Sequence, residues 1–226
     1  MLLPAPDYLE FQLSHLGTCV ITDDGSPLTE QVAQRLSDQG WPVVVLQFPD
    51  TLVKSTALSA IAERLPLTVV EQTLAESSLH QQLLTIAQTY GSIHTFIHLH
   101  PQNPVCDKGV VKAVFLLAKQ LQPFLVQENP RERHSFVTVT RLDGELGLGV
   151  GASRAVSGGL FGLTKTLRLE WPTVFCRAVD IAPELSTVEA ANALLAELHD
   201  PNVFIREVGH GRSGRMTLTC LAEAEC

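Results

Sequence analysis

Short apolar runs alternate with longer segments of helical periodicity along most of this chain. The runs at residues 18–22, 41–46 and 136–140 are rich in Val, Ile and Thr, which is typical of strands that are buried on both faces. Between the first two runs, apolar residues recur every four positions over residues 28–36, and Gly40 stands where a helix would end. The alternation predicts an α/β fold with a doubly wound parallel sheet, because parallel neighbours need a crossover and a right-handed helix supplies it.

The same pattern continues to the C-terminal end, so we expect a single domain over residues 1–226. The predicted strands cover residues 18–22, 41–46, 67–70, 95–99, 136–140, 176–181, 203–207 and 216–220. The predicted helices cover residues 28–36, 77–90, 108–121, 153–170 and 188–198.

Composition and charge limit the class of protein. Hydrophobic residues make up 45% of the chain and charged residues 18%, which favours a globular domain over a disordered segment. The net charge of −8 argues against a nucleic-acid-binding surface, which needs a concentrated basic face. The five cysteines form no CxxC pair, as expected for reduced thiols, and we find neither a signal peptide nor a membrane span. These features predict a cytoplasmic protein.

The loop after the first strand bears on cofactor binding. In dinucleotide-binding folds this loop carries several glycines, which bring backbone amides close to the pyrophosphate. Here it contains Asp23, Asp24, Gly25 and Ser26 before Pro27, with one glycine and two carboxylates. Like charges would repel a phosphate, so we interpret the loop as a degenerate one in which polar side chains cap a helix that starts at the proline.

A more specific likeness lies in the second half of the chain. Residues 157–171 read SGGLFGLTKTLRLEW, and residues 176–183 read CRAVDIAP. This sequence resembles the short-chain dehydrogenases/reductases, and more narrowly the ketoreductase regions of polyketide synthases and polyunsaturated fatty acid synthases. The likeness extends to residues 136–144 and 203–218, and it implies a Rossmann-like fold of the short-chain dehydrogenase/reductase type.

The resemblance also implies where the catalytic residues of the family would fall. The family's serine corresponds to Thr140, its tyrosine to Ser153, and its lysine or asparagine to Ser157. The tyrosine donates the proton in carbonyl reduction, and a serine hydroxyl is no substitute. The chain has only two tyrosines, Tyr8 and Tyr90, and neither stands four residues before a lysine or asparagine. We therefore expect no catalytic residues and no bound cofactor in this chain.

Ketoreductases of this kind consist of two Rossmann-like halves, one structural and one catalytic, and the chain resembles the structural half. The resemblance implies a non-catalytic subdomain that supports β-ketoacyl reduction in the intact synthase, with NADPH in the catalytic half. Its partners would be the catalytic half, other synthase domains and an acyl carrier protein. Two alternatives stay open. One is an active NADPH-dependent reductase with an atypical site that uses Thr140 and Asp143, and the other is an acyl-carrier-binding scaffold.

Three further patterns could mark sites. The histidines at positions 94, 98 and 100 lack a neighbouring cysteine or carboxylate at ligand spacing, so we predict packed or hydrogen-bonded histidines and no metal site. The glycine-rich residues 144–151 follow the wrong strand for a phosphate-binding loop and predict a loop over the mouth of the site. Ser153 and Ser157 have no histidine or acid beside them in sequence, so we interpret them as residues at the start of a helix.

Overall fold

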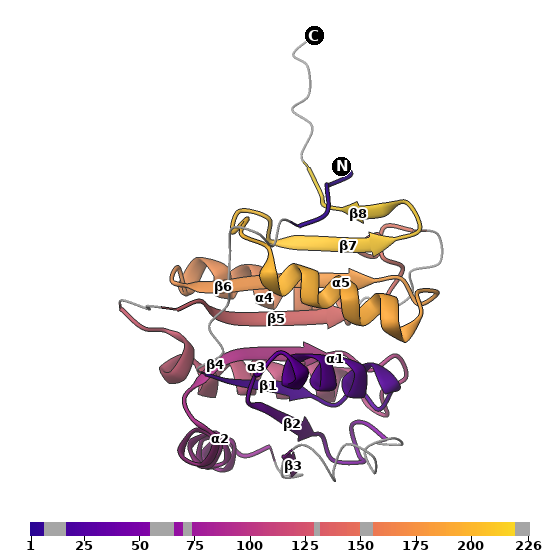
Figure 1. The fold of residues 1–226 in the computed structure, drawn as a ribbon. Helices are drawn as coiled ribbons and strands as arrows, with labels where there is room; N and C mark the ends of the chain where they lie inside the picture. The colour runs from indigo at the N-terminus through magenta and orange to yellow at the C-terminus, as the bar shows by residue number, and fades with distance from the viewer. Residues whose placement is uncertain (7–16, 55–65, 70–73, 129–131, 150–155, 220–226) are drawn as a thin grey trace.

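The structure is organised around one twisted sheet (Figure 1). The computed structural model describes residues 1–6, 17–54, 66–69, 74–128, 132–149 and 156–219. Eight strands lie side by side in the order β3-β2-β1-β4-β5-β6-β7-β8, and all are parallel except β8, which runs antiparallel to β7. The strands are β1 (Thr18–Thr22), β2 (Val43–Gln47), β3 (Leu67–Val69), β4 (Ile93–Leu99), β5 (His134–Thr140), β6 (Val174–Ile181), β7 (Glu207–Gly211) and β8 (Gly214–Met216). This is the predicted doubly wound sheet.

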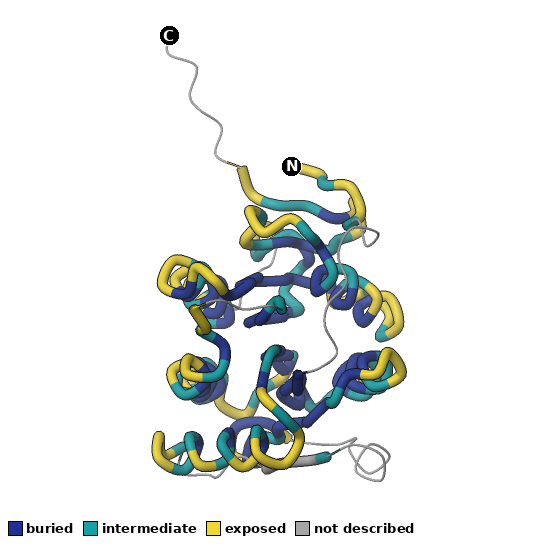
Figure 2. The backbone as a smooth tube through the Cα atoms, turned by 60° about the vertical axis from the view of Figure 1, so that its left-hand side comes forward, coloured by how far each residue is buried: buried dark blue, intermediate teal, exposed yellow. Residues whose placement is uncertain are grey.

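Helices cover both faces of the sheet. They are α1 (Pro27–Asp38), α2 (Glu76–Tyr90), α3 (Asp107–Leu125), α4 (Gly158–Glu170) and α5 (Thr187–His199). The apolar side chains of α2, α3 and α4 form one core with one face, and those of α1 and α5 form a second core with the other. Figure 2 shows the result as strands that are buried along their length and helices that are exposed only on their outer sides.

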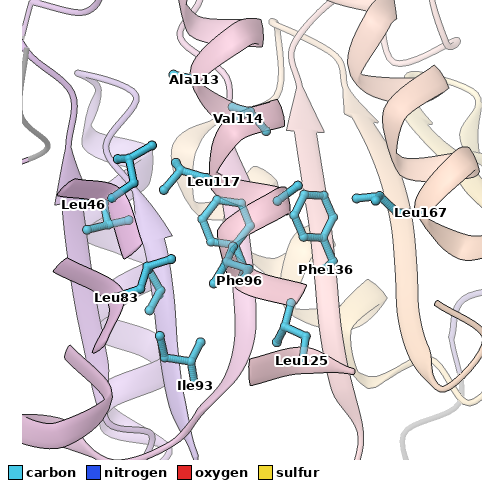
Figure 3. Packing of buried hydrophobic residues seen from close by; sticks show 14 of the residues in the cluster. Leu46, Leu83, Ile93, Phe96, Ala113, Val114, Leu117, Leu125, Phe136 and Leu167 are labelled. Atoms are coloured by element: carbon cyan, nitrogen blue, oxygen red, sulfur yellow. The ribbon is translucent and has the colours of Figure 1, made fainter. Parts of the chain in front are cut away.

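The first core shows why the sequence periodicity predicted the layers. Alternate residues of β4 and β5 point to the same face, and Phe96 stacks on Phe136 there with ring centroids 5.2 Å apart. Leu117 of α3 and Leu83 of α2 pack around this pair (Figure 3). Burying a side chain of this size contributes about 1.5–3 kcal/mol, so these apolar contacts hold the helices to the sheet.

The last two strands differ from the prediction. Residues 203–206 are not a strand; β7 begins at Glu207, and the hairpin turns after Gly211. A Cβ on Gly209 would lie 2.4 Å from the carbonyl oxygen of Gly144. The glycines that we interpreted as turn residues are therefore strand residues, because the loop after β5 approaches the β7 backbone too closely for a side chain.

Buried charges attach the hairpin to α5. Arg177 of β6 donates hydrogen bonds of 2.7 Å to the carboxylates of Glu197 and Asp200. Arg215 of β8 donates to Glu197 over 2.6 Å and also pairs with Asp200. A second donor of Arg215 reaches the carbonyl oxygen of Pro4 over 3.0 Å, so the first residues of the chain are held beside β8.

No helix within the described part of the chain is long and apolar enough to cross a membrane.

Candidate functional site

The candidate site lies at the carboxyl ends of the parallel strands. The strand order reverses direction between β1 and β4, and in open α/β sheets ligands bind outside the strand ends at this switch point. Several of the predicted positions fall at this edge. Thr22 ends β1, His98 and His100 lie at the end of β4, and Thr140 ends β5.

The loop between β1 and α1 is stabilised by its own aspartates. The carboxylate of Asp23 accepts a hydrogen bond of 2.9 Å from the amide of Gly25. Gly25 has a φ of +73°, and a Cβ on it would lie 2.6 Å from the carbonyl oxygen of Lys54. This glycine thus serves a tight turn packed against the chain after β2.

The carboxylate of Asp24 lies at the N-terminus of α1. One of its oxygens accepts from the amide of Ser26 over 2.9 Å and from the hydroxyl of Thr29 over 2.8 Å. The other accepts from the Ser26 hydroxyl over 2.7 Å. Burial raises the pKa of Asp24, and the hydrogen bonds from Ser26 and Thr29 counteract part of that rise. A helix N-terminus is a natural anion site, and here the chain supplies the anion itself.

The capping prediction for this helix is confirmed. Ser26 is the N-cap, its hydroxyl oxygen accepts from the Leu28 amide over 3.2 Å, and Pro27 occupies the first turn.

A row of buried hydrogen bonds crosses from β1 to α3. The hydroxyl of Thr22 lies 2.8 Å from Nδ1 of His98, and Nε2 of His98 lies 3.3 Å from Nδ1 of His100. Nε2 of His100 is 2.9 Å from a carboxylate oxygen of Asp107, the first residue of α3. Burial lowers the pKa of His98 well below its usual value, and the charge of His100 lowers it further. The histidines are hydrogen-bonded, as predicted.

Ser157 joins this row at the start of α4. Its hydroxyl oxygen lies 3.2 Å from Nε2 of His100, and it makes no side-chain cap to the helix. The sequence suggested no partner for this serine, yet the fold places His100 and Asp107 beside it. The arrangement is not that of an activated nucleophile. The same imidazole nitrogen faces both the carboxylate and the hydroxyl, and a carboxylate only accepts, so that nitrogen carries a proton and is not a base.

Thr140 is engaged with a buried carboxylate. Its hydroxyl donates to Asp180 at the end of β6 over 3.0 Å. Asp180 also accepts from backbone amides of the loop after β5, at 2.8 Å from Leu142, 2.8 Å from Gly144 and 3.0 Å from Leu146. Burial raises the pKa of Asp180 against these hydrogen bonds.

Asp143 organises the rest of that loop. Its carboxylate accepts from the amides of Glu145, Gly147 and Gly149 over 2.8, 2.9 and 2.7 Å. Burial acts to raise the pKa of Asp143, but the loop amides outweigh it and the pKa is lowered. The glycine-rich segment that the sequence suggested is therefore, over its described part, a loop wrapped around two carboxylates of the chain.

The predicted tyrosine and catalytic positions lie apart from this edge or outside the description. Ser153, which aligns with the family tyrosine, lies outside the described residues, as does Tyr8. Tyr90 ends α2, and its carbonyl oxygen accepts from the hydroxyl of Thr18 at the first residue of β1. Tyr90 is thus at the amino ends of the strands, the edge opposite the candidate site.

Sequence reasoning missed two residues of this edge. Asp180 closes an apolar strand, and Asp107 is separated from the histidines by a loop. A carboxylate near the end of a buried strand was the available signal for the first. Within the described ranges, no three His, Cys, Asp or Glu side chains converge so as to hold a metal ion.

Comparisons with known proteins agree with this fold. No protein-family model matches the chain. A relative with 32% identity over 213 residues is the large A chain of the polyunsaturated fatty acid synthase of Thraustochytrium sp. (strain ATCC 26185 / S-3). The match covers 91% of this chain but only 7% of that synthase chain, so this protein corresponds to a small part of its relative.

Solved short-chain dehydrogenases are similar in structure. A glucose/ribitol dehydrogenase of this class from Brucella melitensis has a TM-score of 0.61 at 17% identity, covering 85% of this chain and 92% of that one. A short-chain dehydrogenase from Bacillus anthracis gives 0.61 at 16% identity, with 85% and 92% covered. The chain has the Rossmann-like fold of the short-chain dehydrogenases/reductases.

Proposed function

We propose that this chain is a non-catalytic, Rossmann-like structural subdomain that supports the ketoreductase of a polyunsaturated fatty acid or polyketide synthase. In this proposal residues 1–226 form one domain that corresponds to the structural half, and the catalytic half binds NADPH and reduces the β-ketoacyl group. The sequence relationship to a polyunsaturated fatty acid synthase supports the setting.

The observation that carries the proposal is the position of Asp24. Its carboxylate takes hydrogen bonds from Ser26 and Thr29 at the N-terminus of α1, where a pyrophosphate would have to lie. Two unit charges 4 Å apart repel by about 1 kcal/mol in water and by several times more near a protein surface. The loop thus disfavours a dinucleotide by occupying its anion site.

The surroundings of the missing catalytic groups support the same conclusion. The hydroxyl of Thr140 donates its hydrogen bond to Asp180, and Ser157 contacts His100. The atypical-reductase alternative would use Asp143 as an acid, but that carboxylate is bound to three amides of its own loop. The geometry therefore favours the structural role.

The surface of α3 and α4 supports a partner. Phe115 of α3 is 55% exposed and Leu169 of α4 is 68% exposed, on helices that cover the same face of the sheet. Exposed apolar side chains grouped on one face mark interaction sites. We infer that the catalytic half packs against this face.

Calorimetry tests the absence of cofactor binding. NADPH titrated into the folded chain should give no saturable heat up to about 1 mM, which corresponds to a binding free energy weaker than about −4 kcal/mol. Saturation in the micromolar range would overturn the proposal.

Co-purification tests the partner. The chain should associate with the segment that follows the matched residues in the Thraustochytrium synthase, and Phe115→Ser with Leu169→Ser should weaken that association at least tenfold. Phe204→Ser is the matched control, because Phe204 is 87% exposed in the loop before β7 and lies away from α3 and α4. Equal weakening by the control, or no association of the unmodified chain, would contradict the assignment.

A further inference from the structure

The buried row from Thr22 to Asp107 has a defined hydrogen-bond direction. A carboxylate only accepts, so Nε2 of His100 carries the proton that it donates to Asp107. In a neutral imidazole the other nitrogen is then an acceptor, and Nδ1 of His100 must receive a proton from Nε2 of His98. By the same rule Nδ1 of His98 accepts from the hydroxyl of Thr22.

Each atom of this neutral state is satisfied. The Thr22 oxygen, having donated its proton to His98, accepts from the amide of Leu99 over 3.0 Å. His98 is completely buried, and the edge of its ring meets Phe48, with ring centroids 6.1 Å apart. The side chains that face the histidine pair are Thr22 on β1, Phe48 after β2, Asp107 on α3 and Ser157 on α4, and of these Asp107 is the charged one.

The same heavy atoms also accommodate one additional proton. With His100 doubly protonated, its Nδ1–H donates to Nε2 of His98, and Nδ1–H of His98 donates to the oxygen of Thr22. The hydroxyl proton of Thr22 then turns to the carbonyl oxygen of Leu99, which lies 3.4 Å away. Two hydrogen bonds reverse, the bond to Asp107 stays, and the new positive charge rests beside the Asp107 carboxylate.

We propose that Thr22, His98, His100 and Asp107 form a one-proton relay between the protein surface and the carboxyl end of β1. The Asp107 side chain is 28% exposed and is the solvent end, while Thr22 is the buried end at the candidate site. In the transfer, an incoming proton is taken up at the Thr22 oxygen as its own proton passes to Nδ1 of His98. The Nε2 proton of His98 then passes to Nδ1 of His100. One proton enters, two shift along the row, and the imidazolium forms at His100. The reverse sequence releases it.

The position of the charge follows from the surroundings. Among the described residues His98 contacts no carboxylate and is fully buried, whereas His100 touches Asp107 at 2.9 Å. The lowering of the His98 pKa by burial and by charge on His100 agrees with this assignment. His98 therefore changes tautomer and never becomes charged.

Imidazole NMR tests the relay in the complete chain. In long-range proton–nitrogen spectra of the 15N-labelled protein at pH 7.5, both histidines should be neutral with the proton on Nε2. As the pH falls, His100 should become doubly protonated while His98 moves its proton to Nδ1, with one common midpoint. A His98 that keeps its Nε2 proton through that transition, or that becomes charged itself, would overturn the proposal.

A variant tests the role of the carboxylate. Asp107→Asn keeps an oxygen acceptor but removes the charge, so the neutral tautomers should persist while the midpoint for His100 protonation falls by about 1 to 3 pH units. Glu170→Gln, which removes an exposed carboxylate at the end of α4, should leave the midpoint unchanged. A shift of equal size in the control, or no shift with Asp107→Asn, would assign the effect to net charge and contradict the relay.

Discussion

Arg177 and Glu197 form an ion pair of 2.7 Å in which neither side chain is exposed to solvent. The pair joins β6 to α5, and Arg215 and Asp200 complete a network that also holds β8. Removing one charge from such a network leaves the others buried without compensation, which costs more than the ion pair itself contributes.

Glu197→Gln should therefore destabilise the protein by about 3–5 kcal/mol, measured as the free energy of unfolding in urea. Glu184→Gln is the control, because Glu184 forms a surface pair with Arg212 at 3.8 Å, and it should change the free energy by no more than about 0.5 kcal/mol. A loss below about 1 kcal/mol for Glu197→Gln would show that the network does not hold the hairpin.

The same carboxylate predicts a pH dependence. Burial would raise the pKa of Glu197, but hydrogen bonds from His210 and Arg215 and the charges of Arg177 and Arg215 lower it from 4.5 to about 2. A lowered carboxylate pKa stabilises the fold above the unfolded value, and this stabilisation is lost as the pH falls from 4.5 towards 2. The shift corresponds to roughly 3 kcal/mol, of which about 2 kcal/mol should be gone by pH 3.

The difference in unfolding free energy between wild type and Glu197→Gln isolates this effect from other titrating groups. It should be constant between about pH 7 and pH 5.5 and should narrow below about pH 4.5. A difference that stays constant down to about pH 3 would contradict the lowered pKa.

Asp24 provides a third prediction. Because burial raises its pKa, the charge itself is costly, and Asp24→Asn should change the free energy of unfolding by less than about 1 kcal/mol. Asp24→Ala also removes the partner of Ser26 and Thr29, and it should cost about 1–3 kcal/mol. Thermal denaturation of both variants distinguishes the two contributions, and equal losses would show that the charge matters more than the hydrogen bonds.

Asp180 should control the loop after β5. In Asp180→Asn an amide NH2 faces backbone amides of Leu142, Gly144 and Leu146 that now donate to the carboxylate. We expect hydrogen exchange of these amides to accelerate at least tenfold, since lost hydrogen bonds to a charged group are worth about 1.5–3 kcal/mol. Amides of α2, which lie far along the sheet, are the internal reference, and unchanged exchange in the loop would contradict its anchoring by Asp180.

Two glycines should respond in opposite directions to alanine. Gly209→Ala places a Cβ 2.4 Å from the Gly144 carbonyl oxygen and should destabilise by about 1–3 kcal/mol. A Cβ on Gly162 in α4 meets nothing within 4 Å, so Gly162→Ala should stabilise by about 0.5–1 kcal/mol through helix propensity. Chemical denaturation measures both, and a stable Gly209→Ala protein would show that the loop can retreat from β7.

The layered fold was predictable because its signal is local. Strands such as residues 136–140 are apolar throughout, and α1 is marked by Ser26, Pro27 and the periodic residues after them. The hairpin was not predictable, because Gly209 and Gly211 signal a turn in sequence and are strand residues only through the approach of the Gly144 loop.

The candidate site was predictable only in part. The aspartate-rich loop was visible, since its residues are contiguous. The partners of Thr140 and Ser157 come from other strands, Asp180 from β6 and His100 from the end of β4. Only the order of strands in the sheet brings them together, and a single sequence does not state that order.

The hydrogen bond between Thr22 and His98 joins residues that are 76 positions apart, and this has a consequence for biosynthesis. At about 5–20 residues per second, the ribosome needs roughly 4 to 15 seconds to make β4 after β1. During that interval β1, a central strand in the finished sheet, has one edge unpaired, and open edges of apolar strands promote aggregation. A nascent chain of this fold therefore benefits from protection by chaperones until His98 has emerged.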